Sequence, residues 1–484
     1  MRTKSIKYMK GLLVGLIVLF SGCGDWLDVN PRTEMKEEDM FQSEKGFQNV
    51  MNGVYLQMAA KELYGVNTGC YFQDLLAGYW NSISTSSREQ YVMNYYYTYS
   101  SVENLIKTIW SQYYTCIANI NDLLENLKKT DIHFSYGNKE LLMGEAYGLR
   151  AFLHLEVLRL FGPVPTGATD ATEAIPYVTE LTRDPSLLLS LTYGEVKQHI
   201  LDDLEEAEKY LKDDPFTLGS MVELEKTTTK LVEDDWQLYR QTHFNLYAVD
   251  ALRARFYQWI GDKEQAAFYA KKVVEVMNPD GTVKFELANE SNSYSGSRSN
   301  LVMKCEHLFA LHCSNQQTLL EGVLNKKGTG TKLRLKQAWI KSIYENPEAD
   351  CRAKTNRYFE VDGTSAYYLK FAATGSFTVM NMIPLIRVAE MYLILTESLP
   401  LAEAQTYFET YRQARGMDIS VNFSSENGRR ERVQKEYRKE FMGEGQMFFY
   451  YKRNNITSWT IPQKITVPAN GLVVPKPEGQ TMFE

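Results

Sequence analysis

Aromatic side chains outside the regular helices are the residues of this sequence best suited to holding a ligand. The chain of 484 residues contains 32 Tyr and 22 Phe, and aromatic residues make up 13% of it. Tyr and Trp offer a rigid apolar ring with one polar atom, which suits stacking on a sugar face or gripping an extended peptide. Packing in the core is the open alternative for each ring. The sequence thus predicts ligand-binding roles for Trp80, Tyr95, Tyr96, Tyr97, Tyr294 and Trp339.

Motifs for catalysis and for cofactor binding do not occur in the sequence. We find no GxSxG, HExxH, GxxxxGKS/T or GxGxxG pattern. His307 and His312 lie near Cys305 and Cys313, but their spacing matches no zinc site. A carboxylate pair for glycoside hydrolysis stays open, because distance in space defines such a pair. We therefore expect no catalytic residue, no metal and no cofactor.

The start of the chain has the layout of a secretory signal. Residues 1–10 carry four cations, the next ten residues are uncharged and apolar, and two small residues immediately precede Cys23. The apolar run is shorter than the roughly 20 residues that cross a hydrocarbon core. A cysteine after two small residues resembles the bacterial lipobox, although Phe20 stands where Leu is usual; an ordinary signal peptide is the alternative. We expect a signal peptide over 1–22, lipidation of Cys23, and one body over 23–484.

The net charge argues against a nucleic-acid partner. It is −7 for the whole sequence and −11 once the four cations of the signal are removed. Binding of nucleic acid needs a clustered basic surface that neutralises phosphates. We therefore set this class of function aside.

Long amphipathic helices must position the aromatic segments. Apolar residues recur at helical spacing over residues 43–58, 103–128, 139–161 and 192–211. Ser43 is placed as an N-cap, Thr192 and Glu195 form a capping box, and Gly162-Pro163 stops the third helix. We expect such helices to stack as antiparallel pairs.

Two later stretches have the pattern of tetratricopeptide-like helical hairpins, with small residues where two helices cross. They cover residues 247–277 and 386–415. A loop-rich segment of about 279–380 separates them, so we do not expect a regular solenoid. The sequence predicts a mainly α fold, with helical hairpins over 40–277 and 383–453 and a long irregular insertion between them.

Six sequence blocks stand out along the chain. They are CGDWLDVNPRT (23–33), FQSEKGFQNVMNGVYLQM (41–58), LRAFLHLEVLRLFGPVP (149–165), IPLIRVAEMYLILTES (383–398), EYRKEFMGEGQMFFYYKR (436–453) and VVPKPEGQ (473–480). In content and in order these blocks resemble the SusD/RagB family of nutrient-uptake lipoproteins of Bacteroidetes. The middle third of the chain shows no family signal.

The resemblance implies a SusD-like helical lid on the outer face of the outer membrane, anchored through the lipid on Cys23. It implies a SusC-like TonB-dependent barrel as partner, and capture of a glycan, or of a peptide as in RagB-like members, for import. The family's aromatic platform does not transfer residue by residue, because no motif surrounds it here. Two other functions stay open from the residues: a helical scaffold that grips a protein partner without a nutrient ligand, and a surface glycan hydrolase.

Overall fold

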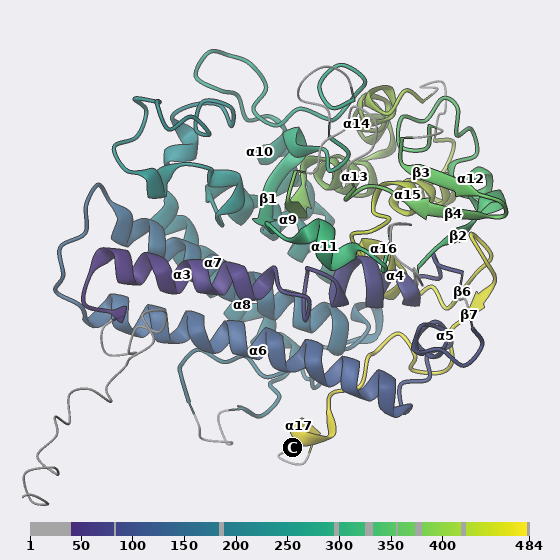
Figure 1. Cartoon of the computed structure of the whole chain (residues 1–484), viewed down its shortest axis with the longest axis horizontal. Coiled ribbons are helices and arrows are strands. Elements are labelled where there is room, and N and C mark those ends of the chain that lie inside the picture. The colour runs from purple at the N-terminus through teal and green to yellow at the C-terminus, as the bar shows by residue number, and fades with distance from the viewer. Residues whose placement is uncertain are drawn as a thin grey trace, which may run out of the picture.

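Helices build most of this computed structural model, as the sequence predicts (Figure 1). The structure describes residues 40–81, 84–182, 188–294, 300–324, 333–354, 357–372, 380–417 and 423–481. The predicted signal peptide and Cys23 lie outside the described residues. In the described ranges, no helix combines the length and the apolar character needed to cross a membrane.

The four predicted N-terminal helices are confirmed. They are α3 (Glu44–Met58), α6 (Ser100–Lys129), α7 (Asn138–Phe161) and α8 (Tyr193–Leu211), and the short helices α4 (Phe72–Leu76) and α5 (Arg88–Met93) lie between the first two. Ser43 caps α3 by accepting a hydrogen bond from the Gly46 amide at 3.2 Å. Thr192 and Glu195 form the expected capping box on α8.

Helix α7 is buried on nearly every side and packs between α6 and α8. Two glycines one turn apart allow its neighbours to approach closely. A Cβ at Gly144 would lie 2.5 Å from Leu211 Cγ, and one at Gly148 would lie 2.2 Å from the Phe244 ring. The close packing around this helix therefore needs glycine at both positions.

Both predicted helical hairpins form, and they meet in space. The first is α9 (Leu246–Ile260) with α10 (Lys263–Val274), and the second is α13 (Val388–Ser398) with α14 (Leu401–Ala414). Strands β1 (His307–His312) and β5 (Met382–Arg387) pair antiparallel on either side of the intervening segment. This pairing closes the segment at its base, so α13 packs directly on α10. Helices α15 (Glu426–Glu440) and α16 (Gln446–Arg453) complete the helical body.

The insertion is more regular than predicted. It contains helices α11 (Gln316–Leu320) and α12 (Gln337–Tyr344) and a sheet of β2 (Leu335–Lys336), β4 (Ser365–Tyr368) and β3 (Phe359–Asp362), in that order across the sheet. These short strands find partners that local sequence does not reveal, so the loop-rich segment also contains a small sheet that the sequence does not predict. A last hairpin, β6 (Ser458–Trp459) with β7 (Ile465–Thr466), precedes the short α17 (Glu478–Thr481).

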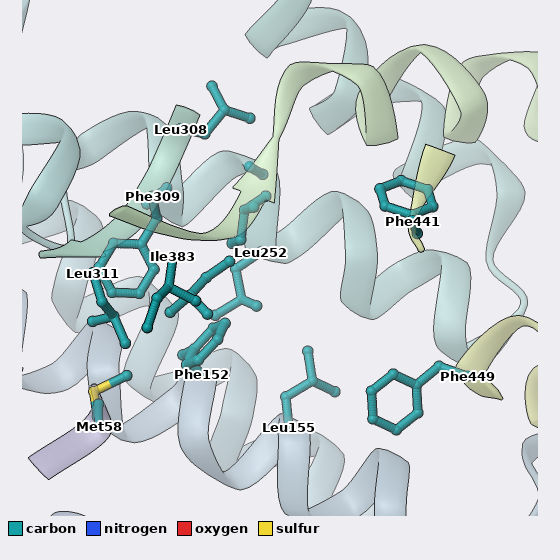
Figure 2. Packing of buried hydrophobic residues seen from close by; sticks show 14 of the residues in the cluster. Met58, Phe152, Leu155, Leu252, Leu308, Phe309, Leu311, Ile383, Phe441 and Phe449 are labelled. Carbon is teal, nitrogen blue, oxygen red and sulfur yellow. The ribbon is translucent and has the colours of Figure 1, made fainter. Parts of the chain in front are cut away.

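The hydrophobic core runs through the whole body, and one part of it lies where the β1–β5 pair meets the N-terminal helices. Figure 2 shows Phe309 of β1 and Ile383 of β5 above Met58 of α3 and Phe152 of α7. The Phe152 and Phe309 rings meet edge to face with centroids 5.6 Å apart. This geometry is the one that aromatic quadrupoles favour. The two strands therefore anchor the insertion to the helical body.

A network of buried charges lies where β5, α14 and α15 converge. The Glu440 carboxylate accepts hydrogen bonds from Arg387 Nη1 at 2.7 Å, from Arg352 Nη1 at 2.8 Å, and from Arg415 Nε and Nη2 at 3.0 and 2.9 Å. Glu306 pairs with Arg387 and Arg415 from the other side, at 2.6 and 2.7 Å. These hydrogen-bonded ion pairs therefore offset the free-energy cost of burying the charges.

Candidate functional site

The candidate site is formed by helix α5 and the turn that joins it to α6. Ser87 caps α5 by accepting a hydrogen bond from the Gln90 amide at 3.2 Å. Tyr95 then takes a left-handed conformation with φ of +59°. The Tyr96 amide donates back to the Tyr91 carbonyl at 2.9 Å, which closes the turn. In Figure 1 this turn lies at the right-hand end of the molecule, near β6 and β7.

Three tyrosine rings, Tyr91, Tyr96 and Tyr99, are stacked on this turn, and we call them the tyrosine stack. The Tyr91 and Tyr99 rings lie 3.8 Å apart at 16°, and the Tyr96 and Tyr99 rings lie 6.0 Å apart at 22°. Tyr96 is 50% exposed and Tyr99 is 45% exposed. Tyr91 supports Tyr99 from one side, so the exposed rings are held in place before any ligand arrives.

The two tyrosines that flank Tyr96 point inward. The Tyr95 hydroxyl donates to the Leu76 carbonyl at 2.6 Å, and the Tyr97 hydroxyl donates to the Gly471 carbonyl at 2.8 Å. Burial raises the pKa of both hydroxyls well above the ordinary value. These two rings therefore anchor the turn to the body and leave Tyr96 as the outward ring of the three predicted here.

Trp80 is fully buried and offers no face to solvent. Its Nε1 donates to the Cys70 carbonyl at 3.0 Å, and its ring lies 6.4 Å from that of Tyr368 on β4. The next residue, Asn81, donates its amide to the Arg334 carbonyl at 2.7 Å. A binding role for the Trp80 ring does not fit this conformation, because the sheet of the insertion covers it.

Tyr294 is buried, and the neighbouring rings of Tyr358 and Tyr368 connect it to Trp80. Trp339 is only half-buried. The Tyr294 ring lies 6.1 Å from Tyr358, whose ring lies 6.0 Å from Tyr368. Tyr294 is only 5% exposed, so it also serves the core in this structure. Trp339 on α12 is half-buried and carries Lys336 Nζ 5.3 Å from the centre of its ring. Trp339 therefore keeps a partly open face.

The cysteines and histidines near β1 form neither a disulfide nor a metal cluster in the described part of the chain. Cys305 is a free thiol beside Ser293, and Cys313 is a free thiol that donates to the Ala59 carbonyl. His307 is buried and donates from Nε2 to the Val302 carbonyl at 2.8 Å. Burial lowers the pKa of His307 to about 3, so its ring is neutral.

The sequence analysis proposed Tyr96 but not its neighbours in the stack, Tyr91 and Tyr99. Tyr99 is the residue immediately before α6, and Tyr91 is on the short helix α5. The signal available in the sequence was the density of tyrosines over residues 91–99. Density alone could not show which rings face outward, because that depends on the turn at Tyr95.

The amino-acid sequence of the N-terminal part of this chain is similar to that of known proteins. A SusD-like family model described as "Starch-binding associating with outer membrane" matches residues 25–223. SusD-like protein P2 of Formosa agariphila is 26% identical over 218 residues, and SusD-like protein P38 of the same organism is 27% identical over 209 residues. These matches cover 44% and 43% of this chain but only 40% and 38% of the two relatives.

Solved structures share the fold over most of its length. A SusD superfamily protein from Bacteroides thetaiotaomicron has a TM-score of 0.68 at 20% identity, covering 91% of this chain and 98% of that one. One from Bacteroides vulgatus has a TM-score of 0.70 at 19% identity, covering 91% and 97%. A laminarin-binding SusD-like protein has a TM-score of 0.58 at 17% identity, covering 85% and 92%. The solved structures show that this chain has the fold of SusD superfamily proteins, and the family model matches its residues 25–223.

Proposed function

We propose that this chain is a non-catalytic, lipid-anchored protein of the outer membrane that binds a nutrient glycan and delivers it to a SusC-like TonB-dependent barrel. The observation that carries the proposal is the tyrosine stack. Two half-exposed rings, with centroids 6.0 Å apart and planes at 22°, present apolar surface and hydroxyl groups to solvent side by side. A platform of this size suits an oligomer whose successive units each present an apolar face.

Polar groups beside the stack can supply the hydrogen bonds that orient a sugar. Gln90 and Asn94 lie on and just after α5, and Gln90 Nε2 donates to Asn94 Oδ1 at 3.1 Å near the surface. Both side chains keep further donor and acceptor capacity for hydroxyl groups. Trp339, half-buried on α12, is a second candidate contact.

The relatives support a glycan before a peptide. The family description names starch, and one solved relative is named for laminarin. The lipid on Cys23 and the partner barrel rest on the lipobox and on the family resemblance, and they are parts of the same proposal. Two acyl chains or more at Cys23 would hold the protein on the membrane durably.

Isothermal titration with a panel of neutral oligosaccharides, laminarin fragments among them, and of peptides tests the proposal. We expect saturable binding of at least one oligosaccharide, with no cleavage products by chromatography. Tyr99→Ala should weaken this binding by about tenfold or more, because a well-placed aromatic anchor contributes more than 1 kcal/mol.

Tyr136→Ala is the matched control, because Tyr136 is 62% exposed and does not belong to the stack. This variant should bind like the unaltered protein. Binding of peptides alone would favour the RagB-like function, released sugar products would favour a hydrolase, and silence towards every ligand would favour a protein scaffold.

A further inference from the structure

A cavity of about 300 Å³ opens between the helices on the side of α9, α15 and α16. Its lining includes the half-buried Pro165 and Ile260 and the exposed Thr166, with the buried Trp259 behind them. This volume is at the lower end of the range for small-molecule sites. None of the residues that line it belongs to the tyrosine stack, so the cavity is a separate place on the molecule.

The cavity is lined by four cations and two carboxylates. Arg453 binds Glu397 with both terminal nitrogens, at 2.9 and 2.8 Å. Arg429, only 4% exposed, pairs with Glu426 and also donates to the Leu399 carbonyl. These two ion pairs neutralise both carboxylates of the lining.

Two cations are left without a counter-charge. They are Lys263, the first residue of α10, and Arg430, the fifth residue of α15. Among the described residues, no carboxylate forms an ion pair with either side chain. This local excess of positive charge stands in a chain whose overall charge is −7. Both residues are exposed, and two unpaired cations that line one cavity raise the local concentration of anions together.

We propose that this cavity is a second binding site, for a small oxyanion such as the carboxylate of an acidic sugar or a sulfate. Arg430 and Lys263 make the charged contacts, and Pro165 and Ile260 provide apolar surface for the body of the ligand. Arg429 and Arg453 are held by their own carboxylates and shape the cavity. The site does not depend on the function proposed for the tyrosine stack.

Calorimetric titration of the purified protein at low ionic strength tests this site. The probes are D-glucuronate, D-glucose as its neutral counterpart, and inorganic sulfate. We expect glucuronate to bind, glucose to bind at least about tenfold more weakly, and added salt to weaken the binding of glucuronate. Sulfate as tight as glucuronate identifies a free-anion site, and weaker sulfate identifies an acidic sugar; either result supports an oxyanion site.

The double variant Lys263→Gln with Arg430→Gln should lower the affinity for glucuronate by about tenfold or more. Lys107→Gln with Lys341→Gln changes the net charge equally at exposed positions outside the cavity, and it should have no effect. Thr166→Trp fills the space without changing charge and should also weaken binding. Equal affinity of the first pair and the control pair, or equal binding of glucose and glucuronate, would overturn the proposal.

Discussion

Replacing Glu440 by glutamine tests how much the buried charge network stabilises the packing of β5, α14 and α15. The Glu440 side chain is fully buried, and Arg352, Arg387 and Arg415 donate to it. The Tyr411 hydroxyl adds a further bond at 2.7 Å. Glutamine keeps the shape of the side chain but removes its negative charge. Its NH2 group would also lie against arginine N–H donors and could not accept their hydrogen bonds. Removing one partner from a buried ion pair costs about 3–5 kcal/mol, and we expect a loss of that size in the free energy of unfolding.

The matched control is Glu345→Gln. Glu345 is also bound by two cations, Lys435 at 2.7 Å and Lys439 at 3.0 Å, but its side chain is 41% exposed. Solvent screens such a pair, so the control should lose about 1 kcal/mol or less. Chemical denaturation followed by circular dichroism measures both variants. If Glu440→Gln were no less stable than Glu345→Gln, the reasoning about this network would be refuted.

The pH dependence of this difference has a definite sign. Burial alone would raise the pKa of Glu440, but Arg415, Arg387 and Arg352 outweigh it and hold the pKa well below the ordinary value. A lowered pKa in the folded state adds stability above the unfolded pKa of about 4.3. The gap between the unaltered protein and Glu440→Gln should therefore be constant near neutral pH and should shrink as the pH falls below about 4.

Three other predictions concern stability and use the same denaturation assay. Trp80→Ala should cost about 3–5 kcal/mol, because it empties a fully buried site, and an unchanged midpoint would show that the ring is not packed as described. Burial alone would raise the pKa of Glu436, but Lys439, Arg352 and Arg412 lower it to about 2. Acidification from about pH 4.5 to 2 should therefore remove on the order of 3 kcal/mol from the free energy of unfolding through this group. A Glu436→Gln variant should lack that part of the loss of stability in acid. Thr192→Ala should cost about 1 kcal/mol by removing the cap of α8, whereas a neutral result would mean that the capping box contributes nothing.

The helices could be predicted because their signals are local. The periodicity over residues 103–128 and the capping box at Thr192 each lie within one element, and both reappear in the structure as α6 and α8. The β1–β5 pair could not be predicted in this way. His307 pairs with Arg387, 80 positions later, and the local sequence of neither strand indicates which segment it pairs with.

The candidate site was predicted by residue type but not by orientation. Tyr95, Tyr96 and Tyr97 are chemically identical in the sequence, yet the left-handed residue at Tyr95 turns the chain so that only Tyr96 faces out. Trp80 looked accessible because its segment is polar and irregular. Its burial depends on the sheet of the insertion, whose Tyr368 ring comes from 288 positions further along the chain.

Crystals soaked with the oligosaccharide that binds most tightly would show whether the tyrosine stack holds a sugar. We expect electron density for a sugar ring against the exposed parts of Tyr96 and Tyr99, with hydroxyl groups near Gln90 or Asn94. A bound oligosaccharide that leaves both tyrosine rings bare would contradict this expectation.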